Sequence, residues 1–167
     1  MPQLNLSATR STGKCRRQKN NTAILIQRIS AEETYPVRQQ VLRPGRPLRE
    51  CFFEGDLEKD SFHLGYFHEG NLAGVATYVA RKNDLFETSL QFQLRGMAVL
   101  PQFRKKNIGE KLLLEGETLL RQTETSILWF NAREVAVEFY KKYGYHTVGE
   151  AFMIPNVCIH IVMYKNL

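Results

Sequence analysis

The chain has 167 residues, of which 43% are hydrophobic and 24% are charged, a composition typical of a globular domain that buries its own core. No apolar run approaches the roughly 18–20 residues needed to cross a bilayer, so we expect neither a membrane span nor a membrane partner. Three cysteines, Cys15, Cys51 and Cys158, lack the spacing of a metal site, and we expect reduced thiols in a cytoplasmic protein.

The formal net charge of +6 is concentrated at the N-terminus. Residues 1–22 contain five basic side chains and no acidic one, whereas the other residues carry 18 basic and 17 acidic side chains. A near-neutral body with a basic tail lacks the basic face of a nucleic-acid-binding protein, so we expect no nucleic-acid partner. We interpret residues 1–22 as a disordered basic extension, with an interaction tail or a targeting segment as alternatives, and residues 23–167 as a single domain.

Strand-like and helix-like segments alternate after the tail. Ser30, followed by two glutamates, predicts the N-cap of a helix that ends near Leu42. In the loop after this helix, Phe52 and Phe53 are expected to point inward. The next two strands predict a hairpin, whose Gly70-Asn71 pair suits positive φ angles. The predicted strands cover, in chain order, residues 23–29, 61–67, 72–80, 88–100, 126–130, 146–153 and 158–165.

A basic loop leads from the strand at residues 88–100 into a helix. Its sequence over residues 104–109 is Arg-Lys-Lys-Asn-Ile-Gly, and apolar residues at helical spacing follow from Ile108. The first N–H groups of a helix lack internal partners and carry the positive end of the dipole, which favours an anion such as phosphate. Asn107 tolerates a left-handed turn, and Gly109 allows close approach of the backbone. A solvated basic surface is the alternative, and the loop matches neither a nucleotide P-loop nor a dinucleotide fingerprint.

Gly96 interrupts the strand that precedes this loop. A glycine inside a strand often marks a β-bulge or a close approach of another backbone. A bulge here would leave unpaired backbone groups near residues 97–99, and an extended, amide-bearing ligand could bind them. A bulge without any binding role is the alternative.

A second group of residues follows the strand at residues 126–130. Taken alone, Asn131 would be an N-cap residue, and Tyr140 would be an ordinary core tyrosine on the apolar face of a helix. Taken together, these residues resemble one segment of the GNAT superfamily of acetyl-CoA-dependent N-acetyltransferases. The matching residues are Asn-Ala-Arg at 131–133, Phe-Tyr at 139–140 and Gly144. That segment has the form Asn-Ala-Arg … Phe-Tyr-x-x-x-Gly-Phe.

The basic loop resembles the phosphate loop of the same family, Arg/Gln-x-x-Gly-x-Gly/Ala, with Asn107 in place of the first glycine. The resemblance covers residues 23–167 in element order and residues 94–145 at the level of motifs. It implies an α+β fold, in which a mixed, mostly antiparallel sheet of about six or seven strands has helices on both faces. It also implies a V-shaped splay between the fourth and fifth strands. Asn107 leaves two alternatives open: the chain binds coenzyme A more weakly than its relatives do, or the loop forms only when the ligand binds.

The resemblance further implies acetyl-CoA as co-substrate, a small-molecule or peptide amine as acceptor, and no metal. The diphosphate of coenzyme A would lie on backbone amides of the basic loop, and its pantetheine arm would lie in the splay. A backbone N–H near Met97 or Ala98 would polarise the thioester carbonyl. The implied coenzyme-binding residues are Met97, Ala98, Val99, Arg104, Lys105, Lys106, Asn107, Ile108, Gly109, Glu110, Asn131, Phe139 and Tyr140.

Two side chains are candidates for proton transfer. The resemblance makes Tyr140 the general acid, because a phenol with a pKa of ~10 stays protonated at neutral pH and can protonate the departing thiolate. The base is open, since the strand before the basic loop has no acidic residue. His160 is the leading candidate, because histidine titrates near pH ~6.5. A purely structural His160, Glu87, Glu150 and a chain of water molecules are the alternatives.

The sequence leaves the acceptor and the oligomeric state open, including a homodimer. We expect residues 43–46 and the Phe52-Phe53 loop to line the acceptor pocket. A module of the same fold that binds coenzyme A without turnover is the alternative function.

Overall fold

The computed structural model of the protein describes residues 25–155 and 158–167. These residues form a seven-stranded sheet in the order β1-β2-β3-β4-β5-β7-β6. Neighbouring strands are antiparallel except β4 and β5, which are parallel. The strands are β1 (Leu25–Ile29), β2 (Phe62–His68), β3 (Asn71–Val79), β4 (Gln91–Val99), β5 (Ile127–Arg133), β6 (His146–Ile154) and β7 (Cys158–Asn166).

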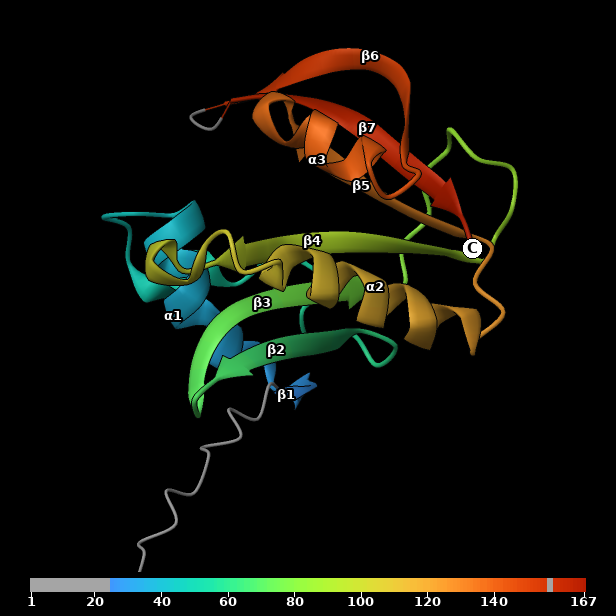
Figure 1. The fold of residues 1–167 in the computed structure, drawn as a ribbon. Helices are drawn as coiled ribbons and strands as arrows, with labels where there is room; N and C mark the ends of the chain where they lie inside the picture. The colour runs from blue at the N-terminus through green and yellow to red at the C-terminus, as the bar shows by residue number, and fades with distance from the viewer. Residues whose placement is uncertain (1–24, 156–157) are drawn as a thin grey trace, which may run out of the picture.

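Helices cover both faces of this sheet, as expected (Figure 1). Leu112 of α2 and Tyr140 of α3 share one buried cluster with Tyr78 of β3, whereas Val37 of α1 packs with Ala98 on the other face. The mixed sheet, its strand number and its helical layers confirm the predicted fold. The helical segments are α1 (Ala31–Leu42), η1 (Leu48–Cys51), η2 (Pro101–Phe103), α2 (Ile108–Arg121), η3 (Glu134–Ala136) and α3 (Val137–Lys141).

Helix α1 begins where the sequence predicts it. The Ser30 hydroxyl accepts a hydrogen bond from the Glu33 backbone N–H at 3.3 Å, and the Glu33 carboxylate accepts one from the Ser30 N–H at 2.7 Å. This reciprocal capping box satisfies two N–H groups that the helix itself cannot satisfy. The helix start is therefore fixed by local sequence, which places the remainder of α1 across β3 and β4.

The basic loop turns sharply before α2. Asn107 is the N-cap residue of α2 and has φ 56° and ψ 24°, the left-handed conformation that asparagine tolerates better than most residues. Its side chain makes no capping hydrogen bond. The expected apolar face is largely buried, since Ile108, Leu112 and Leu120 are all at most 2% exposed.

The alternative role of Asn131 as an N-cap does not hold, and two local expectations were wrong. Asn131 is not an N-cap, because β5 continues to Arg133 through pairing with β7, and the helix starts only after this strand. Phe52 points outward and is 46% exposed, although Phe53 beside it is half-buried. In the β2–β3 turn, positive φ occurs at Glu69 and Gly70 rather than at Gly70 and Asn71. The predictions for residues 1–22 and for the start of the first strand lie outside the described residues.

Candidate active site

The gap between β4 and β5 is the main irregularity of the sheet. The two strands pair only where residues 91–93 lie beside residues 127–129, and beyond this point they diverge (Figure 1). Each strand keeps its other neighbour, β3 or β7. The backbone edges that face the gap therefore lack a strand partner, and this is the predicted V-shaped splay.

A β-bulge marks β4 within the splay. The β3–β4 register shifts opposite Gly96, which has φ 58°, so the predicted bulge is present. A Cβ atom at this position would lie 2.7 Å from Nε of Arg38, which is closer than real Cβ atoms approach other heavy atoms. Both the positive φ and the crowding require glycine here.

A buried ionic cluster supports the bulge from the α1 side. Arg38 is fully buried and forms a bidentate ion pair with Asp56 at 2.6 and 3.0 Å. It also donates to the Thr77 hydroxyl at 2.6 Å. The His63 Nδ1 accepts from that hydroxyl at 2.7 Å, while its Nε2–H donates to the Asp56 carbonyl at 2.9 Å. Burial lowers the pKa of His63, so the ring stays neutral beside the guanidinium.

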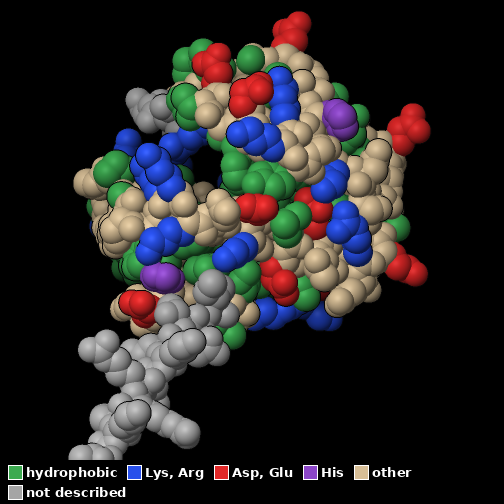
Figure 2. Space-filling view, viewed as in Figure 1, with side chains coloured by type: hydrophobic (Ala, Val, Ile, Leu, Met, Phe, Trp, Pro, Cys, Tyr) green, Lys and Arg blue, Asp and Glu red, His purple; other side chains and the backbone are tan. Residues whose placement is uncertain are grey.

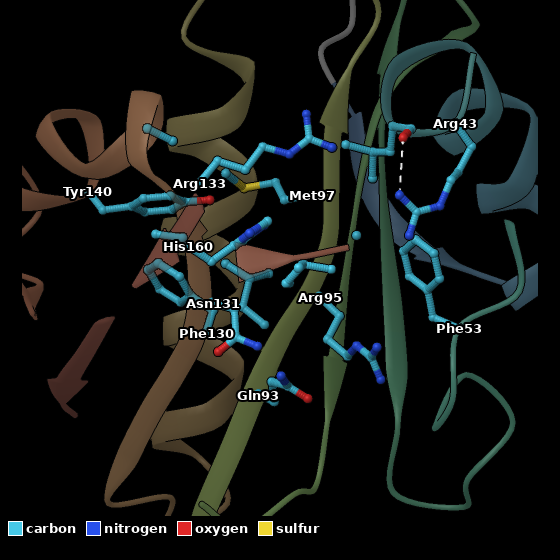
Figure 3. A pocket seen from close by; sticks show the side chains of 16 residues that line it. Arg43, Phe53, Gln93, Arg95, Met97, Phe130, Asn131, Arg133, Tyr140 and His160 are labelled. Atoms are coloured by element: carbon cyan, nitrogen blue, oxygen red, sulfur yellow. Dashed lines mark hydrogen bonds between the residues drawn. The ribbon is translucent and has the colours of Figure 1, made fainter. Parts of the chain in front are cut away.

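A cavity of about 350 Å³ occupies the splay. Figure 2 shows a hollow in this region with Lys and Arg side chains at its rim, and Figure 3 shows the side chains that line the cavity. They come from β4, β5, β6, β7, η3, α3, the end of α1 and the segment after it. The lining residues are Leu42, Arg43, Phe53, Gln93, Leu94, Arg95, Gly96, Met97, Phe130, Asn131, Ala132, Arg133, Ala136, Tyr140, Ile154 and His160.

Tyr140 reaches this cavity from α3 (Figure 3). Its ring packs against Phe130 and Phe139, with centroid separations of 4.2 and 5.0 Å, and the residue is only 9% exposed. Burial raises the pKa of Tyr140 well above that of an ordinary phenol, while the nearby Arg133 partly opposes the shift. The hydroxyl is therefore protonated at neutral pH and can donate a proton within the cavity.

His160 lies on β7 opposite Arg133 of β5 and also lines the cavity. Its Nδ1 lies 2.8 Å from the Cys158 carbonyl oxygen. Because a carbonyl only accepts, Nδ1 carries a proton, and in the neutral form of the ring Nε2 therefore holds the lone pair. Phe152 stacks on the ring with a centroid separation of 6.2 Å. The arrangement suits Nε2 to accept a proton.

A second cavity of about 280 Å³ lies at the start of α2. An α-helix leaves its first N–H groups without internal partners, and here Asn107 provides no side-chain cap for them. The first amides of α2, at residues 108–110, are thus directed out of the helix next to Arg104 and Lys105, which also line this cavity. Gly109 presents no side chain there, and its neighbours on that side are Phe139 and Met97. These features fit the diphosphate of a coenzyme A thioester.

The two cavities bring together most of the residues expected to contact coenzyme A. Met97, Asn131 and Tyr140 line the splay. The second cavity contains Val99, Arg104, Lys105, Asn107, Ile108, Gly109, Glu110 and Phe139. Two expected residues line neither cavity.

Ala98 and Lys106 are the two exceptions. The Ala98 side chain is buried beneath α1, so only its backbone could contact a ligand in the splay. Lys106 turns toward β2, where its Nζ lies 3.1 Å from Nε2 of His68 and above the Phe103 ring.

Several cavity residues were not found by sequence reasoning. Gln93, Arg95 and Arg133 line the splay but belong to no motif. Alternation along a strand indicates that Gln93 and Arg95 share one face, and this was the only available signal. The sequence does not reveal that the faces of β4 and β5 border a common cavity.

A splayed parallel pair beside an uncapped helix start is the arrangement expected of an enzyme that transfers an acyl group from a coenzyme A thioester. Comparison with known proteins agrees with this class. The model of the acetyltransferase (GNAT) domain family matches residues 18–167. The chain is also 36% identical over 142 residues to the uncharacterized N-acetyltransferase YitI of Bacillus subtilis, covering 85% of this chain and 95% of that protein.

Solved structures share the fold at lower sequence identity. ElaA of Escherichia coli has a TM-score of 0.69 at 17% identity, covering 86% of this chain and 99% of that one. The PaiA N-acetyltransferase of Thermoplasma acidophilum, solved in complex with coenzyme A, has a TM-score of 0.64 at 19% identity, covering 87% and 99%. The chain belongs to the GNAT family. It is an acyltransferase of the N-acetyltransferase type, whose family uses acetyl-CoA and acts on amine acceptors.

Two features are absent from the described residues. No helix in them is long and apolar enough to cross a membrane. Across residues 25–155 and 158–167, no three His, Cys, Asp or Glu side chains are grouped as metal ligands.

Proposed function

We propose that the protein binds acetyl-CoA and an amine together and transfers the acetyl group directly, with Tyr140 as general acid and His160 as general base. The observation that carries the proposal is that these two side chains line one cavity in the splay. Acetyl-CoA supplies an acetyl group activated as a thioester. No acyl-enzyme is needed, because the amine is itself the nucleophile.

The chain's own groups would hold the coenzyme in two places. The amides of Ile108, Gly109 and Glu110 would bind the diphosphate, with Arg104 and Lys105 adding positive charge. The unpaired backbone edge of β4 near Met97 and Val99 would bind the amide-bearing arm, as an added strand binds a sheet edge. Asn131 would contact it from β5. An N–H near Met97 or Ala98 would stabilise negative charge on the carbonyl oxygen, and such a donor is worth ~10²–10³ in rate in other enzymes.

Two proton transfers complete the reaction. As the C–N bond forms, the Nε2 lone pair of His160 takes a proton from the amine. As the C–S bond breaks, the Tyr140 hydroxyl gives its proton to the sulfur. Buried Tyr140 returns to its protonated form readily, because burial raises its pKa. The tautomer of His160 is fixed by its bond to the Cys158 carbonyl, which keeps Nε2 available to the amine.

The test is release of free thiol from acetyl-CoA by the full chain, measured against a broad panel of amines. We expect amine-dependent release with stoichiometric N-acetylated product. The Tyr140→Phe and His160→Gln variants should both lower kcat while leaving the dissociation constant of acetyl-CoA unchanged. Saturable binding of acetyl-CoA without thiol release for any amine would contradict the proposal and favour a coenzyme-binding module.

A further inference from the structure

The splay cavity carries a concentration of positive charge that the transfer reaction itself does not require. Three arginines line it, Arg43, Arg95 and Arg133, and no Asp or Glu side chain does. Within the described residues, none of the three forms an ion pair. The backbone carbonyl oxygen of Glu54 accepts a hydrogen bond from Arg95 at 2.6 Å, while the Glu54 carboxylate pairs with Arg81.

Two of the arginines, Arg43 and Arg95, are held in place before any ligand binds. The Phe53 ring lies 5.6 Å from the guanidinium carbon of Arg43 and 5.6 Å from that of Arg95. Figure 3 shows Arg43 and Phe53 together on one wall, with Arg133 reaching from the opposite wall. Cation–π contacts of this kind restrict long side chains, so the charges of Arg43 and Arg95 form a preorganised wall of the cavity.

These arginines lie on the face of the sheet away from the expected diphosphate site. Leu94 of β4 is buried in the cluster with Leu112 of α2, so its neighbour Arg95 points to the opposite, α1 face. Ala132 of β5 belongs to the same cluster, so Arg133 also points to the α1 face. The amides at the start of α2 border the other cavity. The arginines are therefore on the side from which an acceptor would enter.

A buried polar atom nearby is also unpartnered. Gln93 is 6% exposed, lines the splay cavity, and its Oε1 accepts no hydrogen bond from the described residues. A buried carbonyl oxygen without a donor is costly. A ligand with an N–H group at this end of the cavity would satisfy it.

We infer that the acceptor is an amine that also carries an oxyanion, a carboxylate or a phosphate, which binds between Arg133 and the Arg43–Arg95 wall. The inference rests on the proposed function and adds the substrate class to it. Guanidinium groups bind carboxylate and phosphate oxygens in bidentate geometry. A polycationic amine would be repelled by the same three charges. The apolar residues Leu42 and Ile154 also line the cavity and could contact an uncharged part of the acceptor.

The experiment compares matched amines with the full chain and acetyl-CoA. The pairs are L-phenylalanine with L-phenylalaninamide and phosphoethanolamine with ethanolamine, and spermidine serves as a polycation. We expect kcat/KM to be at least tenfold higher for an anionic member than for its neutral partner, and spermidine to be the poorest acceptor. The pair with the larger ratio distinguishes a carboxylate from a phosphate. Equal or better turnover of the neutral amines or of spermidine would overturn the inference.

Variants locate the effect. Arg133→Gln and Arg95→Gln should raise KM for the anionic acceptor at least fivefold and leave KM for acetyl-CoA unchanged. Arg49→Gln is the matched control, because Arg49 is exposed and lines neither the splay cavity nor the cavity at the start of α2. A rise in KM for acetyl-CoA alone would mean that the arginines hold the coenzyme, which overturns the inference.

A binding measurement separates this inference from the proposed function. If no amine releases thiol, the proposed function fails on its own assay. Calorimetry then measures the dissociation constants of two anionic ligands, N-acetyl-L-phenylalanine and N-acetylphosphoethanolamine. The neutral ligand N-acetyl-L-phenylalaninamide is the comparison. Binding of an anionic ligand at least tenfold tighter, and lost in Arg133→Gln, supports the arginine site. Absence of binding by both anionic ligands refutes it.

Discussion

Tyr140→Phe is the substitution that separates the chemical role of the phenol from its packing role. The ring contacts with Phe130 and Phe139 are retained by phenylalanine. No hydrogen bond joins the hydroxyl to the described residues of the protein, so its removal should change the unfolding free energy by less than about 0.5 kcal/mol. The loss of a general acid lowers turnover by ~10²–10⁴-fold, equivalent to about 3–5 kcal/mol of transition-state stabilisation.

The assay is thiol release under saturating acetyl-CoA, with the free energy of unfolding measured on the same samples. We predict a fall in kcat of at least tenfold, an unchanged affinity for acetyl-CoA and an unchanged urea midpoint. Tyr164→Phe is the control, since Tyr164 lines neither the splay cavity nor the cavity at the start of α2. Unchanged turnover in Tyr140→Phe would remove this residue from the mechanism, and equal losses in both variants would refute a specific role.

Substitutions at three other positions test separate parts of the account. His160→Gln should lower kcat/KM for the amine at least tenfold in steady-state kinetics, without weakening acetyl-CoA binding. Full activity in this variant would mean that another group is the base. Asn107→Leu places an unfavourable residue in the left-handed conformation, at a cost of about 1–2 kcal/mol. This variant should bind coenzyme A more weakly in calorimetry, whereas Asn107→Gly should retain the affinity. Equal affinities of the two variants would show that the loop conformation is not needed. Because burial lowers the pKa of His63, the unfolded chain binds its proton more readily. The unfolding free energy should therefore fall as the pH drops below ~6.5, and His63→Gln should flatten this slope; parallel slopes in urea titrations would contradict the shift.

The fold could be predicted largely because its local signals are strong. The Ser30 capping box, the β2–β3 hairpin and the apolar face of α2 each depend on neighbouring residues in the chain. The place of Asn131 inside a strand could not be predicted, because it depends on a distant partner. It resembles an N-cap locally, but β7 pairs with it and extends β5 through Arg133.

The site divides in the same way. Tyr140 and the basic loop could be found because they belong to motifs with fixed spacing. Gln93, Arg95 and Arg133 could not, because their importance arises where β4 and β5 diverge and the faces of both strands border one cavity. Phe53 was expected to point inward, but its contacts with three arginines depend on the return of a loop to the sheet.

The central claim is that the start of α2 binds a diphosphate beside the gap between β4 and β5. A crystal structure of the full chain with coenzyme A tests it most directly. We predict diphosphate oxygens about 3 Å from the amide nitrogens of Ile108, Gly109 or Glu110, with the pantetheine arm between the two strands. Coenzyme A bound elsewhere, or β4 and β5 closed along their whole length with these amides turned away from the ligand, would contradict the account.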